Sequence, residues 1–444
     1  MRNGVYRLGR FANTLSRFLT LTAAPDGLGS LRVFTPLQTA RRCHSYNSIK
    51  VNEGGQPLCN LPYCMKEVSQ KASCCCELYG SKLMMQQHRF INLLEFVMNQ
   101  LEFSKIMDNA VTSKSFSGVV SIHQLDKVLY EKAFGFADHS NKLENKIDTR
   151  FGIASGTKFL TALAVGKLIE AKTLSFSTRL IDCISHQFPN YSPEITIRQL
   201  LNHTSGIPDY YDEEKITDFE NFALNIPNYD LKTLKDYLPA FPNEPMNFAP
   251  GTRFSYCNGG FILLGIVIEE ITGMSYQDYI TQEILKPIGM EQSRFFWLNK
   301  LPENTAFGYL NDAAGWRTNI YNLPIVGGSD GGMFTTARDI SILWKAFFNC
   351  QILSKELVEI YSQPSVKADS ENENIYYGYG LWIREEDNNR EVYILGGDAG
   401  VSFKSAVNLA ENLQSTIISN TTNGVWGILK EIDIALRSLQ KPQV

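Results

Sequence analysis

The sequence lacks a strong charge of either sign, a long apolar run and a regular set of metal ligands. Its formal net charge is −4 over 444 residues, so no large basic surface is expected for a nucleic acid or an anionic membrane. The apolar stretch Phe261–Ile271 is too short to cross a bilayer and contains Glu269 and Glu270, so no transmembrane helix is predicted. Because 44% of the residues are hydrophobic, the chain is expected to bury one large core or two modest ones.

Histidine is scarce, and the cysteines contain no CxxC pair of the kind that zinc sites use. Six of the nine cysteines lie in the first 76 residues, where two interpretations stay open: metal ligands, or unpaired thiols in a loose segment. The candidate ligands are Cys59, Cys64, Cys74, Cys75, Cys76 and His88. The second interpretation is favoured because no second histidine stands at zinc-site spacing, so neither a metal nor a cofactor is predicted. The later cysteines are scattered singly, which is typical of a reduced domain.

The first 50 residues contain eight Lys or Arg and a single acid, Asp26, which is typical of a mitochondrial transit segment. An amphipathic targeting helix is predicted from four apolar residues at helical spacing: Phe11, Leu15, Phe18 and Leu19. A secretory signal is disfavoured because its best core, Phe18–Ala24, is short and broken by threonines. The alternative is a disordered extension that carries no targeting signal. The protein is expected to be mitochondrial if the transit segment is genuine and cytoplasmic otherwise.

The pattern changes at Phe90, after a stretch (51–85) without periodicity that we interpret as a linker. We therefore divide the chain into a largely irregular N-terminal extension, 1–89, and a folded domain, 90–444. Strands are predicted at both ends of this domain, over 116–122, 128–136, 378–383, 392–395, 403–408 and 415–419. Helices are predicted at its start (from Ile91 to Leu101) and over 156–171, 259–271 and the residues after Asn423. Strands at both ends with helices between them indicate an α+β fold.

The segment Phe151-Gly-Ile-Ala-Ser155-Gly-Thr-Lys158 contains the first chemical motif, SxxK. Residues three apart lie on one face of a helix, so Lys158 can reach the Ser155 hydroxyl. A serine needs a neighbouring base to become a nucleophile, and a buried lysine with a lowered pKa can serve as that base. A second copy, Ser438-Leu-Gln-Lys441, lacks any pocket-forming sequence after it. The first copy follows a strand-like segment and starts an apolar helix, which favours it.

The second motif is Tyr256-Cys257-Asn258. A tyrosine can move the proton between nucleophile and leaving group, and an asparagine amide can hold a substrate carbonyl. Tyr309-Leu-Asn311 repeats the pattern by chance. The first copy is favoured because an apolar helix follows it, as expected for a residue presented at a helix start.

Together these stretches resemble the β-lactamase-related serine hydrolases, which include class C β-lactamases, D-alanyl-D-alanine carboxypeptidases and esterases. The matching segments cover roughly residues 110–440, in the family's order: FGIASGTKFLTALAVGKLIE (151–170), ITIRQLLNHTSGIPDY (195–210), FAPGTRFSYCNGGFILLGIVIEEITG (248–273), ILKPIGM (284–290), GGSDGGMFTTARDI (327–340) and GGDAGVSFKS (396–405). The resemblance implies an antiparallel sheet flanked by helices with an all-α lobe. It also implies that Ser155 is acylated, that Lys158 and Tyr256 manage its proton, and that Asn258 contacts substrate.

The family's third motif, Lys or His followed by any residue and Gly, is where the sequence departs. Its best sequence match is Asp398-Ala399-Gly400, with an acid in place of the cation. Asp398 is predicted either to bind substrate or to close a turn, and the Val401 N–H to complete an oxyanion hole with that of Ser155. Losing the cation argues against an efficient β-lactamase, because a substrate carboxylate loses its partner. The nearest cations are Arg390 and Lys404.

Other candidate residues are weaker. His203 is expected to cap or pack rather than to catalyse, and Asp330 in GGSDGG to lie in a tight turn. A Ser-His-Asp triad has no GxSxG elbow to support it. The leading hypothesis is a serine hydrolase that forms an acyl-enzyme on an ester or amide, with a small molecule or peptide as substrate. The alternative is a non-catalytic relative that uses the fold for binding or scaffolding. In either case, the loops 209–229 and 298–318 are expected to shape the pocket.

Overall fold

The computed structural model describes residues 19–23, 29–33, 48–51, 103–112, 114–312, 315–368, 374–386 and 389–439. Contacts divide the chain into two compact units, Met1–Met98 and Asn99–Val444. The boundary predicted between residues 89 and 90 lies outside the described residues. So do the helix predicted from Ile91 to Leu101, the early cysteines and nearly all of the predicted linker.

The first unit contains a three-stranded antiparallel sheet of β1 (Leu19–Ala23), β2 (Gly29–Val33) and β3 (Ser48–Val51), in that order. Leu19, predicted to lie in a targeting helix, begins β1 instead, so the helix prediction is wrong at this residue. The segment LTLTA alternates apolar residues with β-branched threonines, which favours a strand. The other three residues of the predicted helix lie outside the described residues.

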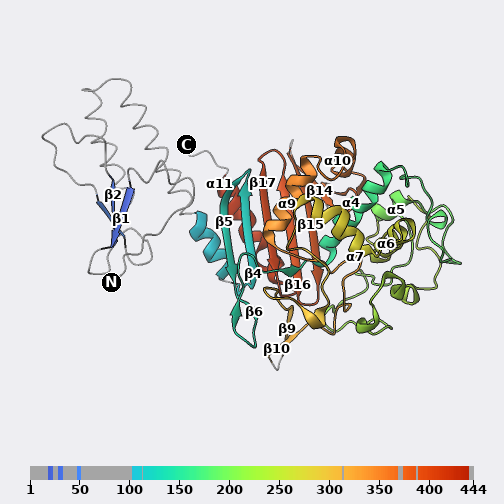
Figure 1. The fold of residues 1–444 in the computed structure, drawn as a ribbon, viewed down its shortest axis with the longest axis horizontal. Coiled ribbons are helices and arrows are strands. Elements are labelled where there is room, and N and C mark those ends of the chain that lie inside the picture. Colours follow the sequence, from blue (N-terminus) through green and yellow to red (C-terminus); the bar gives the residue numbers. More distant parts are fainter. Residues whose placement is uncertain are drawn as a thin grey trace, which may run out of the picture. The chain divides into compact units, whose positions relative to one another are not determined.

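The second unit is built on an eight-stranded antiparallel sheet in the order β12-β13-β14-β15-β16-β17-β4-β5 (Figure 1). The two ends of the domain meet where β17 pairs with β4, with Ile417 opposite Val120. The strand predicted from Gly378 starts four residues late, at Trp382, because Gly380 adopts a positive φ of 77° and turns the chain. The strands are β4 (Gly118–Gln124), β5 (Lys127–Phe134), β12 (Val366–Lys367), β13 (Ile375–Tyr377), β14 (Trp382–Glu386), β15 (Asn389–Asp398), β16 (Val401–Asn408) and β17 (Leu413–Ser419).

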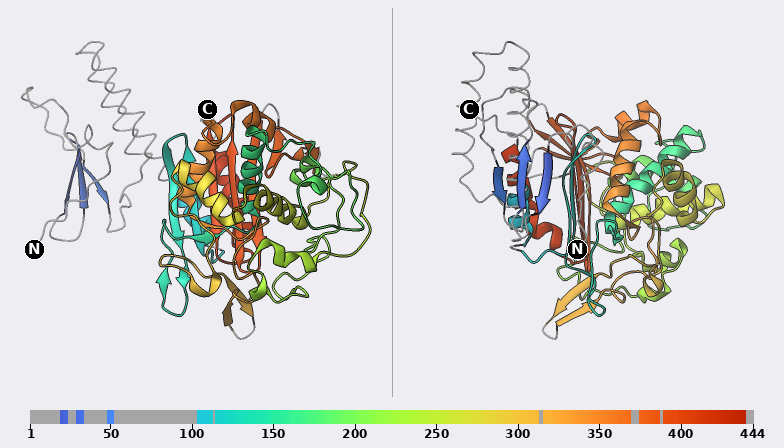
Figure 2. Two further views of the ribbon diagram at one scale, coloured as in Figure 1. Left: turned by 45° about the vertical axis from the view of Figure 1, so that its right-hand side comes forward. Right: turned by 60° about the vertical axis from the view of Figure 1, so that its left-hand side comes forward.

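Helices cover both faces of this sheet, which Figure 2 shows edge-on in its right-hand view. On one face, α11 (Gly424–Leu439) and a helix over 103–112 bury an apolar cluster against β4, β5 and β17. On the other face lie α4 (Thr157–Glu170), α9 (Ala337–Phe348) and α10 (Lys355–Tyr361), followed by a helical lobe. The lobe contains α5 (Ile197–Leu201), α6 (Asn258–Thr272), α7 (Tyr276–Tyr279), a π-helical segment (Ile280–Leu285) and α8 (Lys286–Ile288). The predicted α+β architecture is therefore confirmed.

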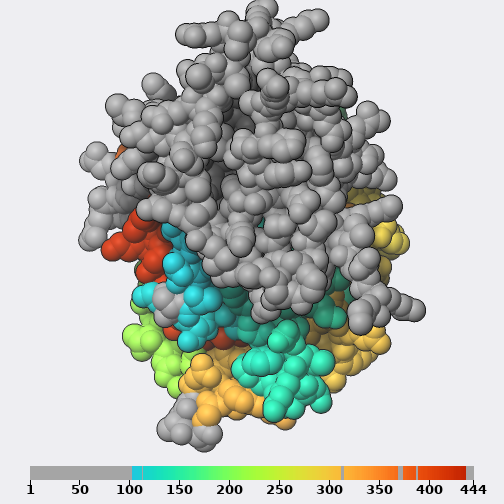
Figure 3. All heavy atoms as spheres, turned by 90° about the vertical axis from the view of Figure 1, so that its left-hand side faces the viewer, coloured from blue at the N-terminus to red at the C-terminus, as the bar shows by residue number. Residues whose placement is uncertain are grey.

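Short hairpins and helical turns complete the domain. Two hairpins, 136–144 and 309–318, lie side by side in Figure 3, and the His139 ring contacts those of Tyr309 and Trp316 at centroid distances of 4.2 and 5.2 Å. The remaining strands are β6 (Phe136–Asp138), β7 (Leu143–Glu144), β8 (Phe151–Gly152), β9 (Tyr309–Asp312), β10 (Gly315–Thr318) and β11 (Phe334–Thr335). The 3₁₀ turns are Ala154–Gly156, Leu180–Asp182, Asn228–Asp230, Leu234–Ala240 and Leu298–Lys300.

Within the described part of the chain, no single helix has the length and apolar character needed to cross a membrane. Only α6 together with the segment Tyr276–Ile288 reaches that length, as a pair bent by 78°.

Candidate active site

Ser155 lies in a tight 3₁₀ turn between β8 and α4. The preceding residue, Ala154, has a positive φ of 42°, which is strained for a residue with a side chain. Hydrogen bonds hold the strained residue: its carbonyl accepts from Thr157 Oγ1 at 2.8 Å and from the Gly332 N–H at 3.3 Å. This turn sets Ser155 at the entrance of a helix whose first N–H groups have no partner within the helix. The sequence prediction of a strand-to-helix junction is confirmed.

Lys158 lies one helical turn further on, 1% exposed, with its ammonium group directed at Ser155. The Lys158 Nζ lies 2.8 Å from Ser155 Oγ, 2.7 Å from Asn258 Oδ1 and 2.7 Å from the Asp330 carbonyl. Burial lowers the pKa of Lys158, against the opposing effect of nearby carboxylates, chiefly Asp330. Because its hydrogen-bond partners are all uncharged groups, Lys158 can lose its proton without breaking an ion pair.

Tyr256 completes the cluster. Its ring lies above Lys158, with Nζ 5.0 Å from the ring centroid, and packs between His203 and Trp382. Burial raises the pKa of Tyr256 well above its usual value, while a hydrogen bond with Ser155 acts in the opposite direction. Tyr256 is therefore a neutral phenol in this state. The structure thus brings Ser155, Lys158, Tyr256 and Asn258 together, as their predicted roles require, and places the second YxN copy elsewhere, in β9.

His203 packs against the Tyr256 ring and binds the backbone next to it. Its Nδ1 accepts a hydrogen bond from the Cys257 N–H at 3.0 Å, and its ring lies 4.3 Å from that of Tyr256. Burial lowers the pKa of His203 well below its usual value, and the positive charge of Lys158 adds to the effect. The expected packing role of His203 agrees with these contacts.

Asn258 is held by residues of the loop 209–229, which the sequence analysis expected to shape the pocket but did not connect with Asn258. Its Nδ2 donates to the Tyr211 carbonyl at 2.9 Å and to Glu213 Oε1 at 3.0 Å, so both amide hydrogens face the protein. Asp209 accepts from the backbone N–H groups of Asn258 (2.6 Å) and Gly259 (2.8 Å) and thereby caps α6 from 49 residues away. Burial raises the pKa of Asp209 to about 7. In the sequence, the one signal for this capping residue is the acidic run Asp209-Tyr-Tyr-Asp-Glu-Glu.

The end of β15 lies against the Ser155 turn through Gly396. A Cβ added at Gly396 would clash with the Ile153 carbonyl and would lie 2.9 Å from the Ser155 nitrogen, so only glycine fits there. The sequence analysis placed the glycine of the third motif at Gly400. Gly400 instead lies in the turn between β15 and β16, at a φ of 71°, and its N–H donates to Thr422. By position, the glycine beside the serine is Gly396, and the residue two before it is Ile394, which is 2% exposed.

The register of β15 decides which N–H groups face Ser155. The Leu409 N–H donates to the Arg390 carbonyl at 3.0 Å, and pairing then continues without a shift to Asp398 opposite Val401. In an antiparallel pair of strands, hydrogen-bonded residue pairs alternate with non-bonded ones, so the even-numbered residues of β15 bond to β16. The N–H of the odd-numbered Gly397 therefore points away from β16, toward the other edge of β15. By the same alternation, the Val401 N–H is directed at Asp398.

Asp398 follows on the same face of β15 as Gly396. Its Oδ1 accepts from the Ala399 N–H at 2.8 Å and from the Tyr211 hydroxyl at 3.4 Å. Burial, together with the negative charges of Glu213 and Asp330, raises the pKa of Asp398 to about 7. Asp398 thus takes part in the turn, as one sequence interpretation has it, and also lines the cavity at Ser155.

The cavity at Ser155 contains carboxylates but no cationic side chain among the described residues that line it. The acids are Glu213, Asp330 and Asp398. The two cations named from the sequence lie elsewhere: Arg390 pairs with Glu385 at 2.6 Å, and Lys404 lies 5.2 Å from the Tyr393 ring centroid. The site is therefore acidic around its buried lysine.

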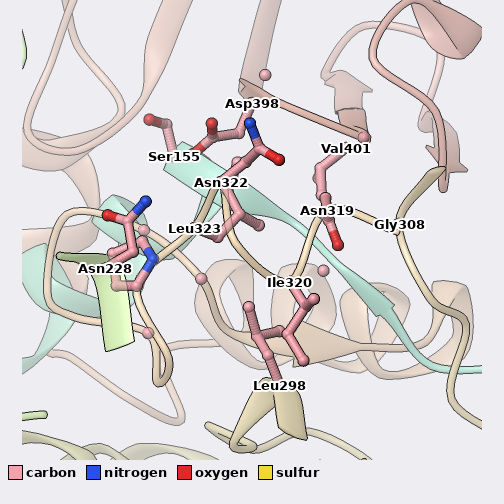
Figure 4. A pocket seen from close by; sticks show the side chains of 18 of the residues that line it. Ser155, Asn228, Leu298, Gly308, Asn319, Ile320, Asn322, Leu323, Asp398 and Val401 are labelled. Carbon is pink, nitrogen blue, oxygen red and sulfur yellow. The ribbon is translucent and has the colours of Figure 1, made fainter. Parts of the chain in front are cut away.

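The walls of the cavity come from the two predicted loops, 209–229 and 298–318, and from the segment after the second. Figure 4 shows Ser155 next to Asp398, with Leu298 and Ile320 at the other end of the view. Glu220 anchors the first loop: its carboxylate accepts from Thr422 Oγ1 at 2.5 Å, and its backbone carbonyl accepts from the Arg317 guanidinium at 3.0 Å. Apolar side chains line the walls: Phe222, Leu224, Leu298, Ile320, Leu323 and Phe334.

Comparison with known proteins agrees with this geometry. Residues 103–432 match the Beta-lactamase family. The chain is 30% identical over 309 residues to Penicillin-binding protein 4* of Bacillus subtilis, covering 65% of this chain and 64% of that protein. It is 32% identical over 216 residues to Protein flp of Staphylococcus aureus, covering 48% of this chain and 41% of that protein. It thus spans less than two thirds of the length of either relative.

A solved structure is also similar to this chain, over nearly the full length of the solved protein. The penicillin-binding protein from Bacillus halodurans superposes with a TM-score of 0.69 at 39% identity, covering 74% of this chain and 99% of that one. The fold is that of the penicillin-binding and β-lactamase-fold proteins. The chain belongs to the β-lactamase family.

Proposed function

We propose that the protein is a serine hydrolase that forms an acyl-enzyme at Ser155 on an ester or amide substrate. The observation that carries the proposal is the 2.8 Å contact between the Ser155 hydroxyl and the amine of a lysine that is 1% exposed. Burial lowers the pKa of Lys158, which gives the lysine the property that a general base needs.

In the first step, neutral Lys158 accepts the Ser155 proton as Ser155 Oγ attacks the carbonyl carbon of the substrate. The neutral phenol of Tyr256 holds a proton that it can donate to the leaving group, and Lys158 then returns a proton to Tyr256. In the second step, water attacks the acyl-enzyme, the same groups accept its proton, and Ser155 leaves with a proton restored.

The negative charge that develops on the carbonyl oxygen needs two donors. We assign them to the Ser155 N–H, at the open start of α4, and to the Gly397 N–H, which points from β15 toward the same place. Gly397 replaces Val401 in this role because Val401 is paired with Asp398 across the hairpin turn.

The substrate that we expect is an ester or an acyclic amide rather than a β-lactam. Where the family's third motif has Lys or His, the corresponding position in β15 is the buried Ile394. The described residues that line the cavity offer no cation to a substrate carboxylate. One observation favours the non-catalytic alternative: the Asn258 amide, which in the family contacts substrate, is already occupied by Tyr211 and Glu213. These two hydrogen bonds of Asn258 do not disturb the contact between Ser155 and Lys158.

Turnover of 4-nitrophenyl esters with short apolar acyl groups distinguishes these two functions. The wild-type protein is expected to release nitrophenol with saturation kinetics, and Ser155→Ala to reduce the rate to that of the buffer. Ser438→Ala removes the serine of the second SxxK copy and serves as the matched control, with unchanged activity. Wild-type protein that matches Ser155→Ala on every ester would support the non-catalytic alternative.

A further inference from the structure

Two carboxylates, Asp398 and Glu213, line the cavity at Ser155. The described residues that line this cavity include no cationic side chain, although the buried Lys158 acts electrostatically on Glu213. Asp398 follows Gly396 by two residues on the same face of β15, and Gly396 lies against the Ser155 backbone. Asp398 Oδ1 accepts from Ala399 and Tyr211, while Oδ2 makes no hydrogen bond to a described residue. Glu213 is exposed and reaches the Asn258 amide from the other side.

These carboxylates change what the site can bind. The Asn258 amide, which could donate to a substrate carbonyl, donates to the Tyr211 carbonyl and to Glu213 instead. The position next to Asn258 therefore presents an acceptor with negative charge. Both carboxylates line the same cavity, and Tyr211 connects them: its hydroxyl donates to Asp398, and its carbonyl accepts from the Asn258 amide that also donates to Glu213. A protonated amine between them would satisfy both.

A metal ion is a poorer occupant of this position. Across the ranges that the structure describes, no three His, Cys, Asp or Glu side chains lie close enough together to hold one. The cavity beyond the carboxylates is apolar, with aromatic and aliphatic side chains such as Phe222, Leu298 and Phe334. An organic cation with an apolar substituent matches both halves of the cavity.

We propose that the site acts on acyl donors that carry a free ammonium group next to the scissile carbonyl and an apolar side chain, that is, amides or esters of apolar amino acids and peptides with a free N-terminus. Asp398 and Glu213 hold the ammonium group, while the apolar wall takes the side chain. The inference rests on the proposed function, because it names the substrate class for the same Ser155 chemistry.

The test compares pairs of acyl donors that differ only in charge. The first pair is phenylalanine 4-nitroanilide, in both enantiomers, and the 4-nitroanilide of 3-phenylpropanoic acid, which lacks the amine. The wild-type kcat/KM is expected to be at least tenfold higher for one enantiomer of the amine-bearing donor. Asp398→Asn and Glu213→Gln are each expected to lower this preference by about tenfold. Glu214→Gln, an exposed neighbour in the same loop, is the matched control.

A charge reversal gives an independent readout. Asp398→Lys is expected to lose the preference for the free amine and to favour N-succinyl phenylalanine 4-nitroanilide, which carries a carboxylate. Equal wild-type kcat/KM for the donors with and without the amine would overturn the inference. So would an equal loss for both donors in Asp398→Asn. If neutral nitrophenyl esters are hydrolysed while the amine brings no preference, only this inference fails. If no ester or anilide is hydrolysed, the proposed function itself fails.

Discussion

Replacing Lys158 by methionine is expected to lower kcat/KM for a 4-nitrophenyl ester by about 10³-fold, the range that a positioned general base contributes. The melting temperature is expected to change by only a few degrees, because two effects oppose each other. Removing a buried amino group relieves its desolvation, which favours the folded state. Leaving Asn258 Oδ1 and the Asp330 carbonyl without their donor costs about 1–3 kcal/mol each.

The pH profile separates a catalytic lysine from a structural one. Burial lowers the pKa of Lys158, so the base form is present above that pKa and is lost as the pH falls through it. The wild-type kcat/KM is therefore expected to decline on the acid side, and this limb is expected to vanish in Lys158→Met. Lys167→Met, in the same helix but paired with Glu283 at 3.2 Å, is the matched control and should keep both the rate and the limb. A large fall in melting temperature with an unchanged pH profile would contradict the assigned role.

The second large effect is expected at Gly396, where an added methyl group meets the catalytic turn. In Gly396→Ala the new Cβ clashes with the Ile153 carbonyl and lies 2.9 Å from the Ser155 nitrogen, so the turn or β15 must move. Overpacking of this kind costs about 1–3 kcal/mol of stability. A displacement of about 1 Å at the nucleophile lowers the rate by about 10²-fold. The two effects are measured by urea unfolding and by ester hydrolysis.

Gly397→Ala is the matched control for this substitution. A Cβ at Gly397 meets only the Trp426 ring, at 3.7 Å, an ordinary contact on the opposite face of the sheet. The substitution keeps the backbone N–H that we assign to the oxyanion hole, so activity is expected to stay within a few-fold of wild type. Similar losses in both variants would show that β15 does not approach Ser155 as described.

Local spacing allowed much of the site to be predicted from the sequence. The three-residue interval between Ser155 and Lys158 determines their contact once the segment is helical, and the apolar helix after Asn258 indicated where the YxN motif would lie. The sheet followed from the same reasoning, because short alternating segments at both ends of a domain pair most simply with one another.

The remaining parts depend on distant contacts and on register. Asp209 caps a helix that starts 49 residues later, and no local pattern reveals such a partner. The third motif was placed on Asp398-Ala399-Gly400, whereas Gly396 lies at the serine. Several glycines fall within five residues there, and only the hairpin register distinguishes them. Leu19 fits two patterns, helical spacing with the apolar residues before it and strand alternation with the residues after it. The structure has a strand there, β1.

Covalent labelling tests the central claim, that Ser155 is an activated nucleophile, most directly. The purified full-length chain is treated with a fluorophosphonate, and its intact mass and peptide map are recorded. We expect one adduct per chain on the peptide that contains Ser155, no adduct in Ser155→Ala, and full labelling in Ser438→Ala. A folded protein that takes up no fluorophosphonate, or a Ser155→Ala variant labelled as fully as wild type, would contradict the account.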